Sequence, residues 1–201
     1  MADRYLHTVL TPSVIEAERH YYGKSYPAYP AEPEPDDLTA NEVAFIESRD
    51  SFYLATVTEN GWPYLQHRGG PAGFVRVLGP RQFGFADYGG NRQMISVGSI
   101  GKLDRVSLFL MDYPRRQRLK VLGHAKVFDA REHADLAARV APPAGHGAKV
   151  ERVFVIDVLG YDWNCPKFIT PRFTSAEINE LVAPLKERIA ELEAQLKKLN
   201  P

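Results

Sequence analysis

The sequence has a single cysteine, Cys165, among its 201 residues. One cysteine can form neither a disulfide framework nor a cluster of thiolate metal ligands within the chain. The six histidines show no spacing typical of metal ligands, so we predict no metal site. The chain also lacks the G-x-G-x-x-G and G-x-x-x-x-G-K-[S/T] motifs, so neither a dinucleotide-binding fold nor a P-loop is supported.

Long apolar runs and an excess of charge are missing as well. No apolar run approaches the roughly 20 residues of a membrane span, and the N-terminal sequence lacks a signal-peptide pattern. We therefore predict a cytoplasmic protein. With 25 basic and 25 acidic residues the formal net charge is zero, so no affinity for nucleic acid or membrane is predicted.

The charge is nevertheless unevenly distributed along the chain. Between Gly61 and Phe128 the sequence has eleven Lys and Arg residues and three acidic residues. A basic centre in a neutral chain favours a small anionic ligand, although a solvated basic face is the alternative.

Short apolar runs separated by turn residues fill the middle of the chain. Asn60-Gly61 between two such runs is typical of a β-hairpin. Six or seven antiparallel strands with short links favour a barrel, because closing a sheet removes its exposed edges. The predicted strands are 51–58, 62–69, 74–78, 81–87, 104–112, 117–129 and 150–163, with short helices at 91–98 and 131–139.

The run from Phe83 to Gly98 is the strongest candidate for chemistry. An apolar strand reaches Asp87, breaks at Gly89-Gly90, and is followed by Asn91, Arg92 and Gln93, which we interpret as the first turn of a helix. The free amides of a helix start and a permanent guanidinium charge suit a phosphate. The alternative is an ordinary loop with an ordinary helix cap.

We predict that the two ends of the chain lie outside this middle domain. We predict an arm at 1–38 that contains a short helix at 13–20 and an extended proline-rich part, a barrel domain at 39–173, and a helix at 174–201. Thr39 with Glu42, and Thr174 with Glu177, fit capping boxes that open helices.

The C-terminal helix has apolar residues at alternating spacings of three and four, which is a heptad pattern. It is either a coiled coil that associates with another chain or a helix packed on its own barrel. We expect Pro184 to kink or restart this helix near Leu185.

Four segments of the middle domain together resemble a known family. PYLQHRGGPAGFVRVL (63–78), FGFADYGGNRQ (83–93), DRVSLFLM (104–111) and RLKVLGHAKV (118–127) are similar, in this order, to the pyridoxamine 5'-phosphate oxidase-like family of flavin-binding proteins. The resemblance implies a mainly β fold, a six-stranded antiparallel split barrel. It also implies a homodimer that binds FMN in a groove between its subunits.

The resemblance also suggests which residues hold the cofactor. The phosphate turn falls on Asn91, Arg92 and Gln93, after Asp87, and neutral Gln93 stands where the oxidases have Lys. The strand beside the flavin ring falls on 66–69, and a further strand contributes polar side chains near the cofactor. The predicted FMN-binding residues are Gln66, His67, Arg68, Gly69, Asp87, Asn91, Arg92, Gln93, Arg118 and Lys120.

These observations lead to one main hypothesis and two alternatives. The first is an FMN-dependent oxidoreductase that moves hydride or electrons between a nicotinamide or other reductant and a small acceptor. The alternatives are a flavin carrier or sensor without turnover, and a family member that binds haem or a deazaflavin.

Three residues each have two interpretations. His67 is either a site residue or a packing residue, and Cys165 is either a reactive thiol near the flavin or an inert buried thiol. Trp163 either anchors the chain end against the barrel or stacks on a ring, and in a dimer it could do both.

Overall fold

The computed structural model describes residues 3–27, 31–90, 92–142, 147–163 and 166–199. Within this part of the chain, seven antiparallel strands form one sheet in the order β2-β1-β5-β6-β7-β4-β3. The strands are β1 (Ser51–Val57), β2 (Pro63–Gly69), β3 (Val75–Gly79), β4 (Gln82–Tyr88), β5 (Arg105–Asp112), β6 (Gln117–Asp129) and β7 (Val150–Trp163).

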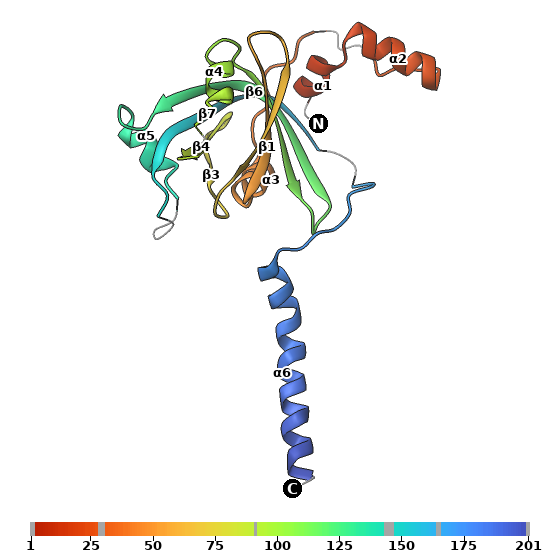
Figure 1. The fold of residues 1–201 in the computed structure, drawn as a ribbon. Coiled ribbons are helices and arrows are strands. Elements are labelled where there is room, and N and C mark those ends of the chain that lie inside the picture. The colour runs from red at the N-terminus through yellow and green to blue at the C-terminus, as the bar shows by residue number, and fades with distance from the viewer. Residues whose placement is uncertain (1–2, 28–30, 91, 143–146, 164–165, 200–201) are drawn as a thin grey trace.

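The sheet curls around its main apolar core and makes a split barrel (Figure 1), and a second, smaller apolar cluster contains Ala86, Val140, Val153 and Val155. The alternation of buried and half-buried residues along β1 places Phe52 and Leu54 in the main core, together with Leu108, Val121 and Ile156. All seven strands predicted from the sequence are present, so the strand-by-strand prediction is confirmed. The six strands implied by the family resemblance are one fewer than the seven found.

The barrel is split because its two edge strands, β2 and β3, do not pair with each other in the described sheet. The β1–β2 hairpin turns where Asn60-Gly61 predicted it, and Gly61 has a φ of +86°, which a residue with a Cβ rarely adopts. The opening left between β2 and β4 is where the candidate site lies.

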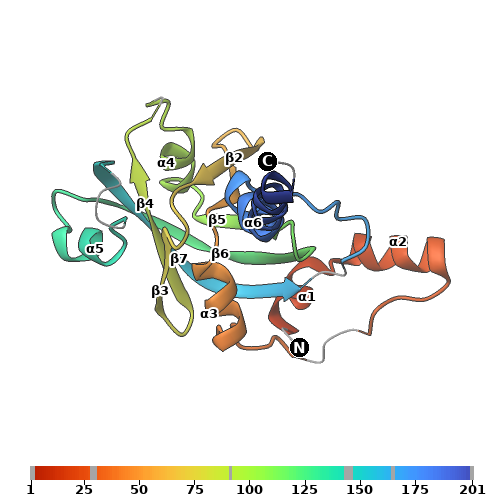
Figure 2. The ribbon, with the colours of Figure 1, turned by 90° about the horizontal axis from the view of Figure 1, so that it is seen from below.

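Short helices cover the ends and edges of the barrel (Figure 2). Helix α3 (Ala40–Glu47) lies beside β3 and begins with the predicted capping box of Thr39 and Glu42. Helix α1 (Asp3–Val9), which the sequence did not predict, packs on β7 through the buried ring of Tyr5. Helix α2 (Pro12–Tyr22) is slightly longer than predicted, whereas α5 (Ala134–Arg139) is shorter.

The C-terminal helix α6 (Ser175–Leu199) extends away from the barrel as a stalk (Figure 1). None of its described residues is buried, so it does not pack on its own barrel. It begins with the second predicted capping box, in which Thr174 and Glu177 exchange hydrogen bonds. The helix runs through Pro184 without a break, so the predicted restart near Leu185 is wrong. A proline removes one backbone donor, and the long helix on either side tolerates that loss.

Candidate functional site

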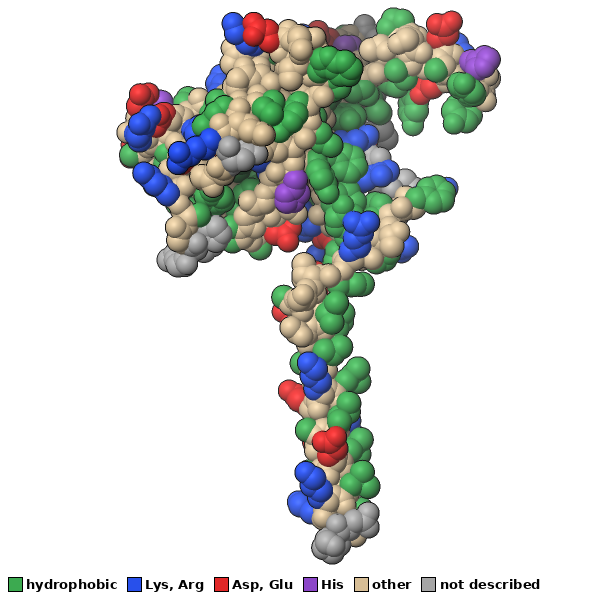
Figure 3. Space-filling model, in the orientation of Figure 1, with side chains coloured by type: hydrophobic (Ala, Val, Ile, Leu, Met, Phe, Trp, Pro, Cys, Tyr) green, Lys and Arg blue, Asp and Glu red, His purple; other side chains and the backbone are tan. Residues whose placement is uncertain are grey.

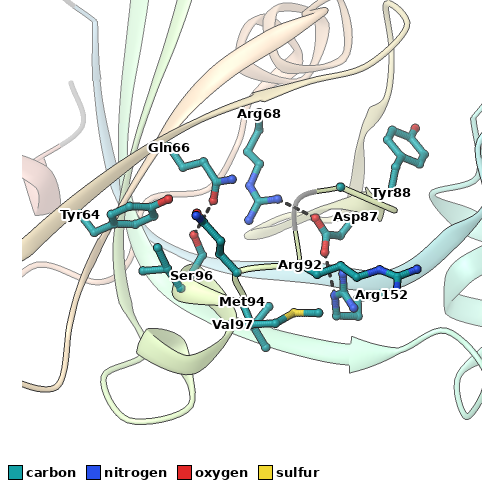
Figure 4. Close-up of a pocket in the computed structure, with 13 residues that line it drawn as sticks. Tyr64, Gln66, Arg68, Asp87, Tyr88, Arg92, Met94, Ser96, Val97 and Arg152 are labelled. Atoms are coloured by element: carbon teal, nitrogen blue, oxygen red, sulfur yellow. Dashed lines mark hydrogen bonds and ion pairs between the residues drawn. The ribbon is translucent and has the colours of Figure 1, made fainter.

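The candidate site is a pocket of about 180 Å³ at the split of the barrel (Figure 4). Strand β2 forms one wall, the end of β4 forms another, and helix α4 (Ile95–Ile100) with the loop before it closes a third. Its lining comprises Tyr64, Gln66, Arg68, Asp87, Tyr88, Gly90, Arg92, Gln93, Met94, Ile95, Ser96, Val97 and Arg152.

A buried carboxylate shared by two arginines organises this pocket. Asp87 on β4 accepts from Arg68 on β2 over 2.6 Å and from Arg152 on β7 over 2.7 Å. The Arg68–Asp87 pair bridges β2 and β4 across the split, where no backbone pairing joins these strands. The Arg68 guanidinium also lies over the ring of Phe154, 4.9 Å from its centroid. One wall of the site is therefore held in place by charge.

The pocket has more positive charge than its own carboxylate neutralises. Three arginines, Arg68, Arg92 and Arg152, line it together with one acidic residue, Asp87. Arg92 is exposed and forms no ion pair among the described residues. The Nε of Arg68 is buried and lacks a hydrogen-bond partner in the same part of the chain. An anion with several acceptor oxygens suits this arrangement.

The backbone that carries Arg92 differs from the sequence prediction. Arg92 and Met94 have φ values of 58° and 57°, in the left-handed region that L residues rarely adopt, and helix α4 begins only at Ile95. The predicted helix start at 91–93 is therefore wrong, and Asn91 lies outside the described residues. Each left-handed residue costs about 1–2 kcal/mol, a cost that the surrounding structure must offset.

The opposite wall of the pocket is neutral and polar. Ser96, buried at the start of α4, donates a hydrogen bond of 2.9 Å to Oε1 of Gln66 on β2. This bond leaves the amide nitrogen of Gln66 able to donate elsewhere. On the β4 wall, next to Asp87, burial raises the pKa of the Tyr88 phenol above its usual value, so this group stays protonated at neutral pH. Figure 4 shows Tyr64, Gln66 and Arg68 side by side along β2.

The structure brings together half of the ten predicted site residues. Gln66, Arg68, Asp87, Arg92 and Gln93 all line the pocket. His67 and Gly69 are on the opposite face of β2, because side chains alternate along a strand, and the His67 ring packs edge-on against Tyr53. Neither residue reaches the pocket of its own chain.

Arg118 and Lys120 are also away from the pocket, on the outer face of β6. Arg118 lies over the ring of Phe109, 5.9 Å from its centroid, and its Nε is buried without a hydrogen-bond partner among the described residues. Lys120 pairs with Asp162 over 2.7 Å and lies over the ring of Tyr5. Within one chain these two cations therefore belong to a separate face.

Eight of the thirteen residues that line the pocket were not among the predicted site residues, and Tyr64, Ser96 and Arg152 are three of them. Tyr64 could have been found from the alternation of β2, since it is two residues before Gln66. Ser96 and Arg152 gave no such signal. Arg152 is on β7 and reaches Asp87 only because β7 pairs with β4.

Trp163, at the end of β7, lies outside the pocket and anchors the chain end. Its ring packs edge-on against Phe45 at 4.7 Å, and its Nε1 donates a 2.6 Å hydrogen bond to Glu42 on α3. The predicted anchoring role is confirmed. Cys165 lies outside the described residues. No described helix is both long enough and apolar enough to cross a membrane.

The middle of the chain, residues 38–161, matches the sequence model of the pyridoxamine 5'-phosphate oxidase family. The match covers more than half of the chain and contains all seven strands apart from the end of β7. The protein belongs to the pyridoxamine 5'-phosphate oxidase family. No curated protein sequence matches this family member significantly.

Several solved structures are similar to this oxidase-family chain at low sequence identity. HupZ from Group A Streptococcus is 15% identical, with a TM-score of 0.48 over 68% of this chain and 100% of its own. A protein described as a putative pyridoxamine 5'-phosphate oxidase from Lactobacillus delbrueckii is 20% identical, with a TM-score of 0.46 over 63% of this chain and 93% of its own. A related FMN-binding protein from Nostoc punctiforme is 14% identical, with a TM-score of 0.42 over 57% of this chain and 73% of its own.

Proposed function

We propose that the protein binds FMN in the pocket between β2, β4 and α4, and that it is an FMN-dependent oxidoreductase. The observation that carries this proposal is the positive charge of the pocket in a chain from this family, because three arginines line it against Asp87 inside it and Glu151 beside it. A phosphate monoester, with a charge of about −1.5 to −2 at neutral pH, is attracted to that positive charge.

The donor set of the pocket fits the phosphate group. Arg92 has a guanidinium that no carboxylate occupies among the described residues. Arg68 and Arg152 share Asp87, and Arg152 also pairs with Glu151 over 3.1 Å. Arg92 would hold the phosphate, with Arg68 and Arg152 supplying the charge that neutral Gln93 does not.

The neutral wall fits the polar edge of the flavin ring. The amide nitrogen of Gln66, oriented by Ser96, and the Tyr64 hydroxyl would hydrogen-bond to that edge. When bound, FMN supplies the chemistry of hydride and electron transfer. The residues of the pocket would bind FMN and orient its ring.

The size of the pocket favours a site completed by a second copy of the chain. Its volume of about 180 Å³ is below the roughly 300–1,000 Å³ of typical ligand pockets. We therefore propose a homodimer in which the outer face of one barrel covers the pocket of the other, giving two equivalent sites.

The outer face of β2, β1, β5 and β6 suits that interface. Tyr53 and Phe109, which are paired across β1 and β5, are only partly buried, and Leu65 is 64% exposed. His67, Arg118 and Lys120 are on this same face, so the dimer would bring them to the partner's cofactor.

Replacing Arg92 by Ala tests the phosphate site. We expect Arg92→Ala to weaken FMN binding by about 1.5–3 kcal/mol, the typical contribution of a hydrogen bond to a charged group. Riboflavin, which lacks the phosphate, should bind the variant and the wild type almost equally. Isothermal titration calorimetry gives both affinities.

Lys102→Ala is the matched control, because Lys102 is an exposed cation outside the pocket and its replacement removes the same charge. It should leave FMN affinity unchanged. Equal FMN affinity in Arg92→Ala and wild type would place the phosphate elsewhere.

Spectra of the purified protein separate the alternative cofactors. A yellow chromophore that bleaches with dithionite supports a flavin, whereas a Soret band supports haem. Steady oxidation of NADH or NADPH supports an enzyme, and bound flavin without turnover supports a carrier or sensor. A chain with one cysteine suits the reducing cytoplasm, where we place this activity.

A further inference from the structure

Helix α6 exposes an apolar stripe that no described part of its own chain covers. Figure 3 shows hydrophobic side chains gathered along one side of the stalk, with charged side chains on the other. The exposed fractions of Leu185, Ile189, Leu192 and Leu196 lie between 41% and 63%. A monomeric protein rarely leaves such a continuous stripe in water.

The stripe follows a strict heptad repeat. Its residues alternate between spacings of four and three, which assigns every one of them to an a or a d position. The a positions are Val182, Ile189 and Leu196, and the d positions are Ile178, Leu185, Leu192 and Leu199. The repeat spans most of a helix that is roughly 37 Å long at 1.5 Å per residue.

We propose that α6 pairs with α6 of a second copy of this chain as a parallel, in-register, two-stranded coiled coil. The choice of core residues carries the first part of this proposal. β-branched residues at a combined with Leu at d favour two parallel strands over three or four. Val182 and Ile189 occupy consecutive a positions, and Leu185, Leu192 and Leu199 occupy consecutive d positions.

The charges beside the stripe carry the second part. In a parallel pair, the g residue of one helix faces the e residue five positions later in the other. Arg188 is at g and Glu193 is at e, so Arg188 of each copy faces Glu193 of the other. A parallel pair of identical helices therefore has two equivalent attractive contacts between Arg188 and Glu193.

The remaining residues of α6 fit the same arrangement. Pro184 is at position c, on the outer side of such a pair, so it does not interrupt the contact between the two helices. The outward positions b, c and f otherwise hold Ala, Glu and Lys, which are good helix formers. The apolar stripe is thus confined to the seam.

A cysteine at a d position tests the pairing in the full-length protein. Cys165→Ser removes the only native cysteine, and Leu192→Cys is then added within the seam. In a parallel, in-register pair the two introduced thiols face each other, so mild oxidation should crosslink most of the protein on a non-reducing gel.

Glu187→Cys in the same background is the matched control, because Glu187 is at position f and faces outward. It should crosslink at least tenfold less. Equal crosslinking of the two variants would show only that the helices are near each other, and no crosslinking at Leu192→Cys would mean that they do not pair in register. Either result overturns the proposal.

Charge exchange identifies the partner as a second copy and leaves the core intact. Arg188→Glu and Glu193→Arg each turn two attractive contacts into repulsive ones, so each variant alone should lose about fivefold or more in association, read from crosslinking of Leu192→Cys. Mixing the two variants restores attraction and should restore crosslinking. A mixture that crosslinks no better than either variant alone contradicts the pairing.

The proposal is independent of the proposed cofactor site. Arg188→Glu leaves the pocket untouched, so flavin content should stay the same if α6 and the barrel act separately. Light scattering then gives the mass of the wild-type assembly. If the barrels and the helices pair about the same two-fold axis, the mass is twice the chain mass of 22.6 kDa. If they pair with different partners, the mass is larger.

Discussion

The barrel and α6 use the same apolar residues in opposite ways. In the barrel, Phe52, Leu54 and Ile156 are at most 1% exposed and are covered by other parts of the chain. In α6, Ile178, Leu185 and Leu199 are 47–76% exposed, and no described residue of the helix is buried. The barrel core is complete in one chain, whereas the apolar face of α6 is not.

This difference separates stability from association. Apolar area covered by the chain itself stabilises the fold, at about 25 cal/mol for each Å² removed from water. Apolar area left exposed contributes nothing to stability until another surface covers it. Substitutions in the barrel should therefore change its unfolding, and substitutions in α6 should change only assembly.

The largest loss of stability is expected from a substitution in the centre of the barrel. Phe154 is fully buried, stacks on Phe85 at 4.9 Å, and supports Arg68. Phe154→Ala should lower the free energy of unfolding by about 3–5 kcal/mol, measured by urea denaturation. Leu192→Ala, in α6, should change barrel unfolding by less than about 0.5 kcal/mol. A comparable loss in both variants would mean that the two regions are coupled.

A smaller loss of barrel stability is expected at the contact between Trp163 and Glu42, where the barrel ends and the link to α6 begins. Burial raises the pKa of Glu42, but hydrogen bonds from Thr39 and Trp163 outweigh it, so the net pKa is lowered. Glu42 therefore stabilises the fold above its unfolded pKa of about 4.3, and this contribution is lost as the pH falls through the lower, folded pKa.

Trp163→Phe keeps the ring beside Phe45 but removes the donor to Glu42. At pH 7 it should cost about 1.5–3 kcal/mol of barrel stability, and the cost should shrink below pH 4. Trp62→Phe, at a side chain that is 71% exposed, should cost nothing at either pH. Chemical denaturation at both pH values measures these differences, and a pH-independent cost would contradict the role assigned to Glu42.

The smallest effect compares the two capping boxes. Thr39 caps α3, which is packed on the barrel, and Thr174 caps α6, which is not. Thr39→Ala should lower barrel stability by about 1 kcal/mol. Thr174→Ala should only fray the first turn of α6, seen as faster hydrogen exchange at residues 175–178, with an unchanged barrel melting temperature. A shift of that temperature would argue against a separate stalk.

Much of the fold could be predicted because its signals are local. The turn at Asn60-Gly61, the two capping boxes and the strand at 51–58 each depend on neighbouring residues, and each is found close to where it was predicted. The start of α4 was not predictable in the same way. Gly89-Gly90 offers flexible backbone before the loop, yet the left-handed residues are Arg92 and Met94, which have no propensity for that conformation.

The site was predictable only where strand alternation or local sequence determines it. Asp87, Arg92 and Gln93 follow one another along the chain, and all three line the pocket. The run 66–69 was predicted as a unit, although a strand sends Gln66 and Arg68 to one face and His67 to the other. Arg152 could not be found without knowing that β7 lies beside β4.

The position of Arg68 has a consequence for solubility. β2 is an edge strand, with unpaired backbone groups along one side that could accept a strand from another molecule. A charged side chain pointing inward from an edge strand disfavours such an addition, because a new neighbouring strand would bury the charge. Arg68 points inward and pairs with Asp87, so an added strand would have to bury this ion pair. The arginine that bridges the split thus also protects the open edge of the sheet against aggregation.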